Sequence, residues 1–208
     1  MFYRISPELV LRTRWRPYLP REGERVLVLA AASVFPPGHP TTRLCLDLLA
    51  ETLAAGPEAR LLDVGCGSGA LLLAGVALGA QLGVGVDLSS KAAAATRENA
   101  RANGLAGAVH VVRGSTECLR GTFGIILGNL PWLVHKDKAA EFTRLARPGT
   151  RLILSGFKDT QEGELRSRYQ PEDWVLDRRH TRDECLAVLP PEKSLTWVAW
   201  RLRRRGRG

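Results

Sequence analysis

The chain has 208 residues, of which 45% are hydrophobic and 25% charged, an ordinary composition for one globular domain. No apolar run approaches the roughly 20 residues that a membrane-spanning helix needs, and the first residues lack the apolar core of a secretory signal. The four cysteines stand apart without a Cys-x-x-Cys pair, so neither a zinc site nor a disulfide framework is indicated. These features predict a cytoplasmic protein with no membrane segment and no metal.

Positive charge is concentrated at the two ends of the chain. Lys and Arg number 30 against 21 Asp and Glu, a formal net charge of +9. Residues 1–25 hold six Arg and three Glu, and residues 201–208 hold five Arg and no acid, which leaves residues 26–200 at +1. Basic ends suit contact with RNA, and a solvated tail that keeps the protein soluble is an equally good interpretation.

The first 38 residues are predicted to form an N-terminal arm with two short strands, over residues 8–12 and 25–31. A proline-rich loop then leads into a helix over about residues 41–54, where leucines recur at helical spacing. Pro40 suits the first turn of this helix, and a threonine hydroxyl is expected to cap its free amides.

From residue 60 onward strands and helices alternate. The strands are predicted at about 60–64, 82–87, 108–113, 123–129, 151–155, 173–179 and 195–203. The helices are predicted at about 69–79, 91–103, 137–147 and 161–169, with Ser89 or Ser90 capping the second and Gly104 closing it. This order predicts an α/β fold with a doubly wound, mostly parallel seven-stranded sheet, which binds its ligand at the carboxyl ends of the strands. We assign residues 39–204 to this domain and residues 205–208 to a basic tail.

The stretch Arg60–Leu73 has the features of a nucleotide-binding turn. A short apolar strand leads directly into Gly65, Gly67 and Gly69 and then into a helix-forming segment. Glycine allows a ligand to lie against the backbone, and the helix N-terminus offers free N–H groups to an anion. The spacing to Ala70 also fits the dinucleotide fingerprint, so an NAD site remains an alternative.

Two carboxylates bear on which nucleotide ligand this turn binds. Asp63 precedes the first glycine, and Asp87 ends the next apolar run, where a carboxylate can accept from both ribose hydroxyls. With these residues the sequence resembles the class I S-adenosylmethionine (SAM) dependent methyltransferases, a Rossmann-like family, which implies SAM as the cofactor. In that architecture Ser115, just after the third strand, lies where adenine contacts often arise.

The fourth strand ends in Asn129-Leu-Pro131-Trp132, which resembles the Asn/Asp-x-Pro-aromatic motif of enzymes that methylate nitrogen. Attack by a nitrogen lone pair depends largely on orientation. The Asn129 carbonyl can accept the N–H bonds of an amine, Pro131 stiffens the turn, and Trp132 can attract a cationic amine or flank a flat substrate. The structural alternative is a strand-ending turn with a packed tryptophan. His135 is interpreted either as a proton acceptor or as a solvent-facing loop residue.

Four segments resemble the PrmA family of ribosomal-protein methyltransferases, which act on lysine side chains and the α-amine. They are Phe35-x-x-Gly-His-Pro-Thr-Thr-Arg-Leu-Cys-Leu, Leu62-Asp-Val-Gly-Cys-Gly-Ser-Gly, Ala95-Thr-Arg-Glu-Asn-Ala and Arg147-Pro-Gly-Thr-Arg-Leu-Ile-Leu-Ser-Gly. The resemblance covers roughly residues 34–205. Together with the motifs above it gives the predicted cofactor-binding residues Thr42, Asp63, Gly65, Gly67, Gly69, Asp87, Ser115 and Asn129.

The sequence departs from the family pattern in three places. The loop before His39 is shorter and richer in proline than the family's Phe-Gly-Thr-Gly-x-His. The separate N-terminal domain that recognises the family's ribosomal substrate is expected to be missing. Pro131 and Trp132 after the asparagine are more typical of rRNA adenine dimethyltransferases, which keeps an RNA base open as the substrate.

The sequence therefore predicts a SAM-dependent N-methyltransferase whose substrate is a protein amine. The resemblance to the PrmA family implies that this amine belongs to a ribosomal protein. The alternatives are an RNA base N-methyltransferase, an NAD(P)-binding oxidoreductase and a SAM-binding protein without catalysis that docks on a ribonucleoprotein. The oxidoreductase lacks support because no Tyr-x-x-x-Lys set is present.

Overall fold

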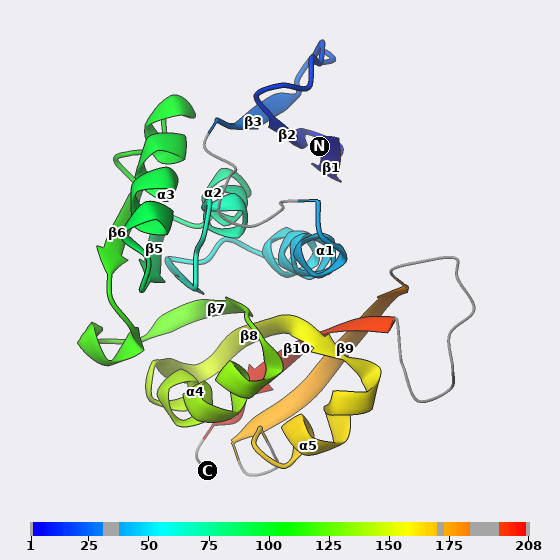
Figure 1. Cartoon of the computed structure of the whole chain (residues 1–208), viewed down its shortest axis with the longest axis vertical. Helices are drawn as coiled ribbons and strands as arrows, with labels where there is room; N and C mark the ends of the chain where they lie inside the picture. Colours follow the sequence, from blue (N-terminus) through cyan, green and yellow to red (C-terminus); the bar gives the residue numbers. More distant parts are fainter. Residues whose placement is uncertain (1, 31–37, 170–172, 184–195, 207–208) are drawn as a thin grey trace.

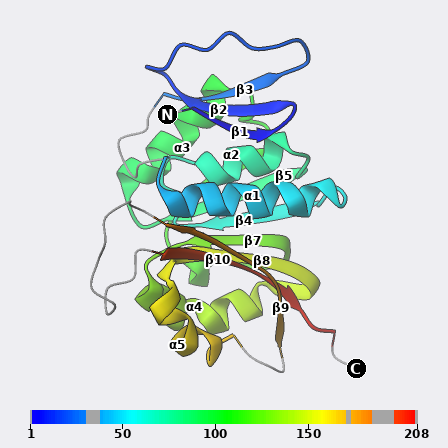
Figure 2. The ribbon, with the colours of Figure 1, turned by 90° about the vertical axis from the view of Figure 1, so that its right-hand side faces the viewer.

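The computed structural model describes residues 2–30, 38–169, 173–183 and 196–206. Cys185 and the start of the proline-rich loop, Phe35–Pro37, lie outside these residues. The described elements are stacked in layers: a small sheet, three helices, a large sheet and two further helices (Figures 1 and 2). The predicted α/β fold with a mostly parallel seven-stranded sheet is confirmed.

The large sheet has the strand order β6-β5-β4-β7-β8-β10-β9. Its strands are β4 (Arg60–Val64), β5 (Leu82–Asp87), β6 (Val109–Arg113), β7 (Phe123–Asn129), β8 (Ala146–Lys158), β9 (Trp174–Asp183) and β10 (Thr196–Arg204). Strands β4 to β8 run parallel, whereas β10 pairs antiparallel with both β8 and β9. Strand β8 begins five residues before its predicted start because Ala146 already pairs with Phe123 of β7.

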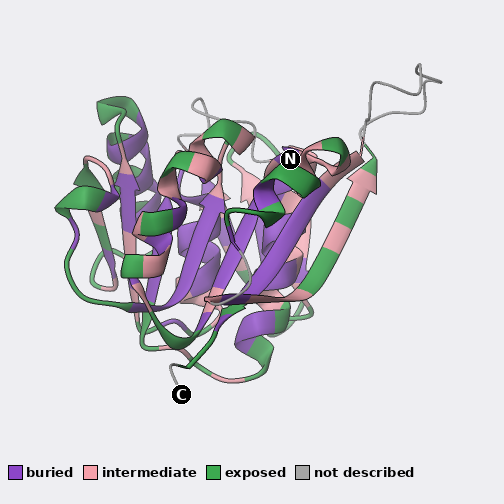
Figure 3. Ribbon diagram, turned by 90° about the horizontal axis from the view of Figure 1, so that it is seen from below, coloured by how far each residue is buried: buried purple, intermediate pink, exposed green. Residues whose placement is uncertain are grey.

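Both faces of the central strands are covered, and their residues fill the core (Figure 3). Ile125, Ile126 and Leu127 are successive residues of β7 and all are fully buried. A strand buried on both faces reads as a continuous apolar run without alternation. This explains why the strands were recognisable in the sequence.

One group of helices covers one face of the large sheet and a second group covers the other (Figure 2). The first group is α1 (Pro40–Ala54), α2 (Ala70–Ala77) and α3 (Ser90–Ala102), and the second is α4 (Trp132–Arg144) and α5 (Glu162–Arg166). Short 3-10 turns lie at Thr116–Cys118 and Asp159–Gln161. Ser89 caps α3 and Gly104 follows it at a φ of +69°, as predicted. The expected threonine cap of α1 is wrong, because Nδ1 of His39 accepts from the Thr41 N–H at 3.3 Å.

Helix α4 starts at Trp132, five residues before the predicted position. Pro131 is its N-cap with extended backbone, and its carbonyl accepts from the N–H groups of Val134 and His135. The proline therefore starts the helix instead of ending the preceding loop. Helix α5 is shorter than the predicted 161–169, because Gln161 belongs to the 3-10 turn and the helix already ends at Arg166.

The N-terminal residues form a three-stranded sheet of β1 (Phe2–Ser6), β2 (Leu9–Thr13) and β3 (Arg25–Leu29). Strands β2 and β3 correspond to the two predicted strands, whereas β1 was not predicted because it is short and half polar. This sheet packs over α1 and α2, and its inward leucines and Ile5 share one apolar cluster with these helices (Figure 2). Residues 2–29 thus extend the hydrophobic core.

The Gly156→Ala variant tests how tightly β8 supports the turn after β7. Gly156 has a φ of +102°, and an added Cβ would lie 2.1 Å from the carbonyl oxygen of Leu130. Because backbone cannot swing away as a flexible side chain can, we expect a loss of about 2–4 kcal/mol in the free energy of unfolding, measured with urea. Gly163→Ala in α5 is the control, since nothing lies within 4 Å of its added Cβ. Equal urea midpoints for the two variants would contradict the close contact.

Candidate active site

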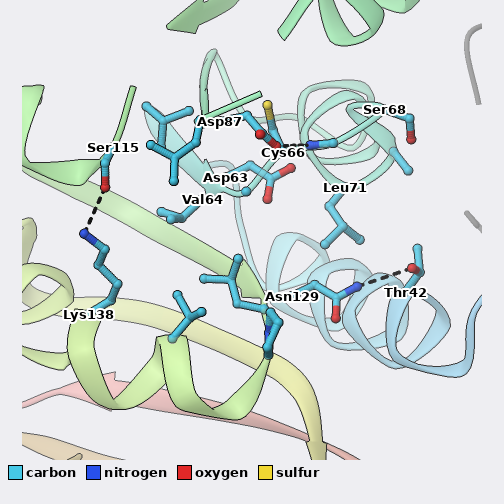
Figure 4. A pocket seen from close by; sticks show the side chains of 18 of the residues that line it. Thr42, Asp63, Val64, Cys66, Ser68, Leu71, Asp87, Ser115, Asn129 and Lys138 are labelled. Atoms are coloured by element: carbon cyan, nitrogen blue, oxygen red, sulfur yellow. Dashed lines mark hydrogen bonds between the residues drawn. The ribbon is translucent and has the colours of Figure 1, made fainter. Parts of the chain in front are cut away.

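A cavity of about 410 Å³ opens at the carboxyl ends of β4, β5 and β7 (Figure 4). Eight predicted site residues line it, namely Thr42, Asp63, Gly65, Gly67, Asp87, Ser115, Asn129 and Pro131. Two predicted site residues, Gly69 and Trp132, are not among its lining residues. Residues absent from the predicted set also line it, including Cys66, Leu71, Leu130, Val134 and Lys138. The volume is in the range of pockets that hold small ligands.

The three loop glycines have different structural roles. All three have a positive backbone φ angle, which residues with a side chain rarely adopt. A Cβ on Gly65 would lie 2.5 Å from Cδ2 of Leu130, whereas one on Gly67 would meet no atom closer than 3.9 Å. A Cβ on Gly69 would lie 2.8 Å from the methyl group of Thr96. Gly69 therefore allows α3 to approach the loop, while Gly67 leaves open space at the cavity.

Asp63 places a buried carboxyl group on the cavity wall. Its relative exposure is 1%, and burial is the main cause that raises its pKa to about 8, with a smaller contribution from the negative charge of Asp87. A hydrogen bond from the backbone N–H of Leu72 opposes this shift. Within the described part of the chain, Oδ2 of Asp63 has no hydrogen-bond partner. An unpaired buried oxygen of this kind is complementary to a positively charged ligand group.

Asp87 is held at the end of β5 by two backbone hydrogen bonds. The N–H of Gly67 donates to Oδ2 at 3.0 Å, and the N–H of Ser89 donates to Oδ1 at 2.9 Å. Each carboxylate oxygen retains acceptor capacity after one such bond. The arrangement suits the predicted acceptance of two hydroxyl groups.

Asn129 is the last residue of β7, and its side chain is oriented by α1 (Figure 4). The Nδ2 group donates to Oγ1 of Thr42 at 3.3 Å, across 87 positions of sequence. Its Oδ1 atom therefore remains available to accept hydrogen bonds from a ligand. The Trp132 ring is partly buried against an apolar core cluster, and its centroid lies 5.1 Å from Nζ of Lys136. This position matches the alternative of a packed tryptophan.

The sequence matches the family described as ribosomal protein L11 methyltransferase (PrmA) over residues 3–190. The chain belongs to the PrmA family. A ribosomal protein L11 methyltransferase of Geobacter metallireducens is 40% identical over 154 residues, which cover 74% of this chain and 50% of that protein. One of Sorangium cellulosum is 34% identical over 184 residues, covering 88% of this chain and 58% of that protein. The chain thus spans about half the length of the curated relatives it matches.

A solved structure with the same fold is the ribosomal protein L11 methylase of Lactobacillus delbrueckii subsp. bulgaricus. It superimposes with a TM-score of 0.81 at 21% identity, covering 99% of this chain and 98% of that one. At this identity the likeness supports the fold and says nothing of the substrate.

Lys138 of this PrmA-family chain was not predicted to belong to the site. Its ammonium group donates to Oγ of Ser115 at 2.9 Å and forms an ion pair with Glu117, so α4 is tied to the segment after β6 (Figure 4). Val134 and Lys138 are one turn apart on α4 and both line the cavity. The four-residue spacing of Val134 and Lys138 indicates a shared helix face only when the helix is known to start at Trp132.

His135 is neither solvent-facing nor a lining residue of the cavity, so both interpretations from the sequence are wrong. It is fully buried in α4, its Nε2–H donates to the carbonyl of Ser155 at 2.8 Å, and its ring meets that of Phe157 edge-on. Burial is the main cause that lowers its pKa to about 4. The side chain is thus a neutral core group near physiological pH.

The buried imidazole predicts acid sensitivity. In the unfolded chain His135 takes up a proton near its ordinary pKa of 6.5, whereas in the folded protein it does so only near pH 4. Stability is therefore lost as the pH falls between these values, by about 3 kcal/mol at most. We expect unfolding free energies of His135→Gln, measured from pH 7 to 4, to show a shallower fall than wild type. His110→Gln, on the exposed face of β6, should keep the wild-type slope; a matching loss of slope there would refute the assignment.

Among the described residues, no group of three or more His, Cys, Asp or Glu side chains is placed to hold a metal ion. The described helices include none that is long and apolar enough to cross a membrane.

Proposed function

We propose that this PrmA-family protein is a SAM-dependent N-methyltransferase that acts on a protein amine. The observation that carries the proposal is the meeting of Asp63, Asp87, the glycine loop and Asn129 around one cavity of suitable size. Lone glycine loops occur in many nucleotide-binding sites, whereas the asparagine beside the loop is suited to an amine acceptor.

The residues of the cavity fit SAM. SAM carries a sulfonium and an ammonium group, and the unpaired Oδ2 of Asp63 would complement one of these positive charges. Asp87 would accept the ribose hydroxyls, and the open space at Gly67 would admit the ligand against the backbone. When bound, SAM supplies a methyl group activated for transfer by its positive sulfur.

The acceptor amine would be oriented by Asn129. Thr42 fixes the amide so that its oxygen can accept an N–H bond and aim the nitrogen lone pair. An amine such as lysine starts with a pKa of about 10.4 and must lose a proton first. Leu71, Leu130 and Val134 give the cavity an apolar lining, which favours the neutral amine.

A ribosomal protein is the proposed substrate, because the relatives are named for ribosomal protein L11. With such a substrate the protein would act in the cytoplasm, and residues 39–204 are the proposed methyltransferase domain. The basic ends would assist by contacting ribosomal RNA. RNA base methylation is the competing proposal, and Asn129-Leu-Pro-Trp is the feature that favours it.

Calorimetric titration with SAM, with NAD(H) as the control, tests the proposal. We expect saturable binding of SAM alone; binding of NAD(H) alone would point to the oxidoreductase. Labelled SAM is then incubated with unmethylated ribosomes, and the protein and RNA fractions are counted separately. Label in RNA and not in protein would replace the proposed substrate with the RNA alternative.

A further inference from the structure

Two side chains of α3 bind the carbonyl groups of the glycine loop. Oγ1 of Thr96 donates to the carbonyl of Gly67 at 2.9 Å, and Nδ2 of Asn99 donates to the carbonyl of Ser68 at 2.8 Å. Thr96 and Asn99 are fully buried and lie one turn apart on the same helix face. Neither of these two residues is among those that line the cavity, so they hold the loop from outside it.

The same Asn99 amide also reaches the N-terminal sheet. Its Oδ1 atom accepts from the backbone N–H of Ala30, just after β3, at 2.8 Å. At the C-cap of α3, Asn103 pairs with both the N–H and the carbonyl of Val28, at 2.7 and 2.9 Å. Two asparagine side chains thus bind the edge of β3 as a neighbouring strand would. Of the two, Asn99 is the one that also contacts the glycine loop.

We propose that Asn99 is a positioning residue that couples the N-terminal sheet to the cofactor loop. The inference rests on the proposed function and extends it, because the cofactor site then depends on residues far outside the cavity. A buried amide with a bond at each end can satisfy both partners in only one orientation. Displacement of Ala30 would turn the amide away from Ser68, and movement of Ser68 would loosen β3.

Coupling of this kind is reciprocal. If β3 helps to fix the loop for SAM, bound SAM must in turn strengthen the bond from Ala30 to Asn99. The Val28 N–H, which bonds to Asn103, is an internal reference on the same strand. We expect SAM to slow hydrogen exchange of the Ala30 amide by about fivefold relative to that of Val28, which is at the lower end of common coupling strengths.

The test compares Asn99→Ala with Asn103→Ala in the full chain. Both variants release the edge of β3, and both should lower the melting temperature. Asn99→Ala alone leaves the Ser68 carbonyl without its donor, so calorimetry should show SAM affinity lowered about tenfold, the value of one buried hydrogen bond. Asn103→Ala should bind SAM within about twofold of wild type, and the selective slowing at Ala30 should vanish in Asn99→Ala.

Thr96→Val, which retains shape but removes the bond to Gly67, covers the case in which Asn99→Ala does not fold. It should also weaken SAM binding. Wild-type affinity in Asn99→Ala or, failing that variant, in Thr96→Val would overturn the positioning role. So would equal weakening in Asn99→Ala and Asn103→Ala, because a loosened β3 would then account for the loss. Failure of wild type to bind SAM is a different result and counts against the proposed function.

Discussion

The Asp63→Asn variant is expected to bind SAM about 10- to 100-fold more weakly than wild type. It removes the negative charge opposite a positive ligand group but retains an oxygen that can accept from the Leu72 N–H. Binding by wild type should strengthen up to about tenfold per pH unit as the pH rises toward 8, where the carboxyl ionises, and then level off. Calorimetry from pH 6 to 9 measures both effects.

The same substitution should stabilise the protein in the absence of SAM. Burial raises the folded-state pKa of Asp63 from 3.8 to about 8, so the folded state holds a proton that the unfolded chain has released. The contribution of this carboxyl to stability is present below pH 4 and is lost as the pH rises through 8. Relative to wild type, Asp63→Asn should therefore gain unfolding free energy across this window, by roughly 6 kcal/mol at most.

Asp137→Asn, at an exposed position of α4, is the control for charge removal. It should change neither the affinity for SAM nor the free energy of unfolding. If Asp63→Asn bound SAM as tightly as wild type, and its affinity changed with pH in the same way, Asp63 would not be a cofactor-binding residue. Loss of binding together with loss of stability would instead indicate a purely structural carboxylate.

The Asn129→Ala variant should lose about 100- to 1,000-fold in turnover while largely retaining SAM binding. We propose that its amide oxygen orients the acceptor amine, and loss of one well-placed polar group in an active site has an effect of this size. Single-turnover transfer of labelled methyl groups to unmethylated ribosomal protein L11 provides the rate, and calorimetry provides the affinity for SAM.

Thr42→Val is the companion variant, because it removes the acceptor that holds the Asn129 amide and leaves Asn129 in place. An intermediate loss of turnover is expected, since the amide can still visit its productive orientation. Unimpaired turnover in Asn129→Ala would show that another group orients the nucleophile.

The parts of the site carried by local sequence patterns were predictable. Gly65, Gly67 and Asp87 follow apolar strands directly, so the strand pattern alone placed them at one edge of the sheet. Asn129 was placed there in the same way, and all four line the cavity. Parallel strands order their carboxyl ends without any knowledge of side-chain packing.

The remaining features depend on contacts between distant segments. Lys138 reaches Ser115 only because α4 begins at Trp132, and the burial of His135 depends on the same helix start. Gly69 faces Thr96 instead of the cavity, which the loop sequence does not reveal. Asn99 was visible only as part of a family motif, since its bonds to Ser68 and Ala30 join segments 31 and 69 positions away.

The strand order at one edge of the large sheet bears on the time course of folding. Strand β10 follows β9 in the chain but lies between β9 and β8, so β9 has no partner within the sheet until β10 has been synthesised. During translation the apolar face that includes Trp174 and Leu176 would stay exposed until the sheet is complete, and exposed apolar surface favours aggregation. The pairing of β10 with both neighbours places Trp200 in the core and links β9 to the rest of the sheet.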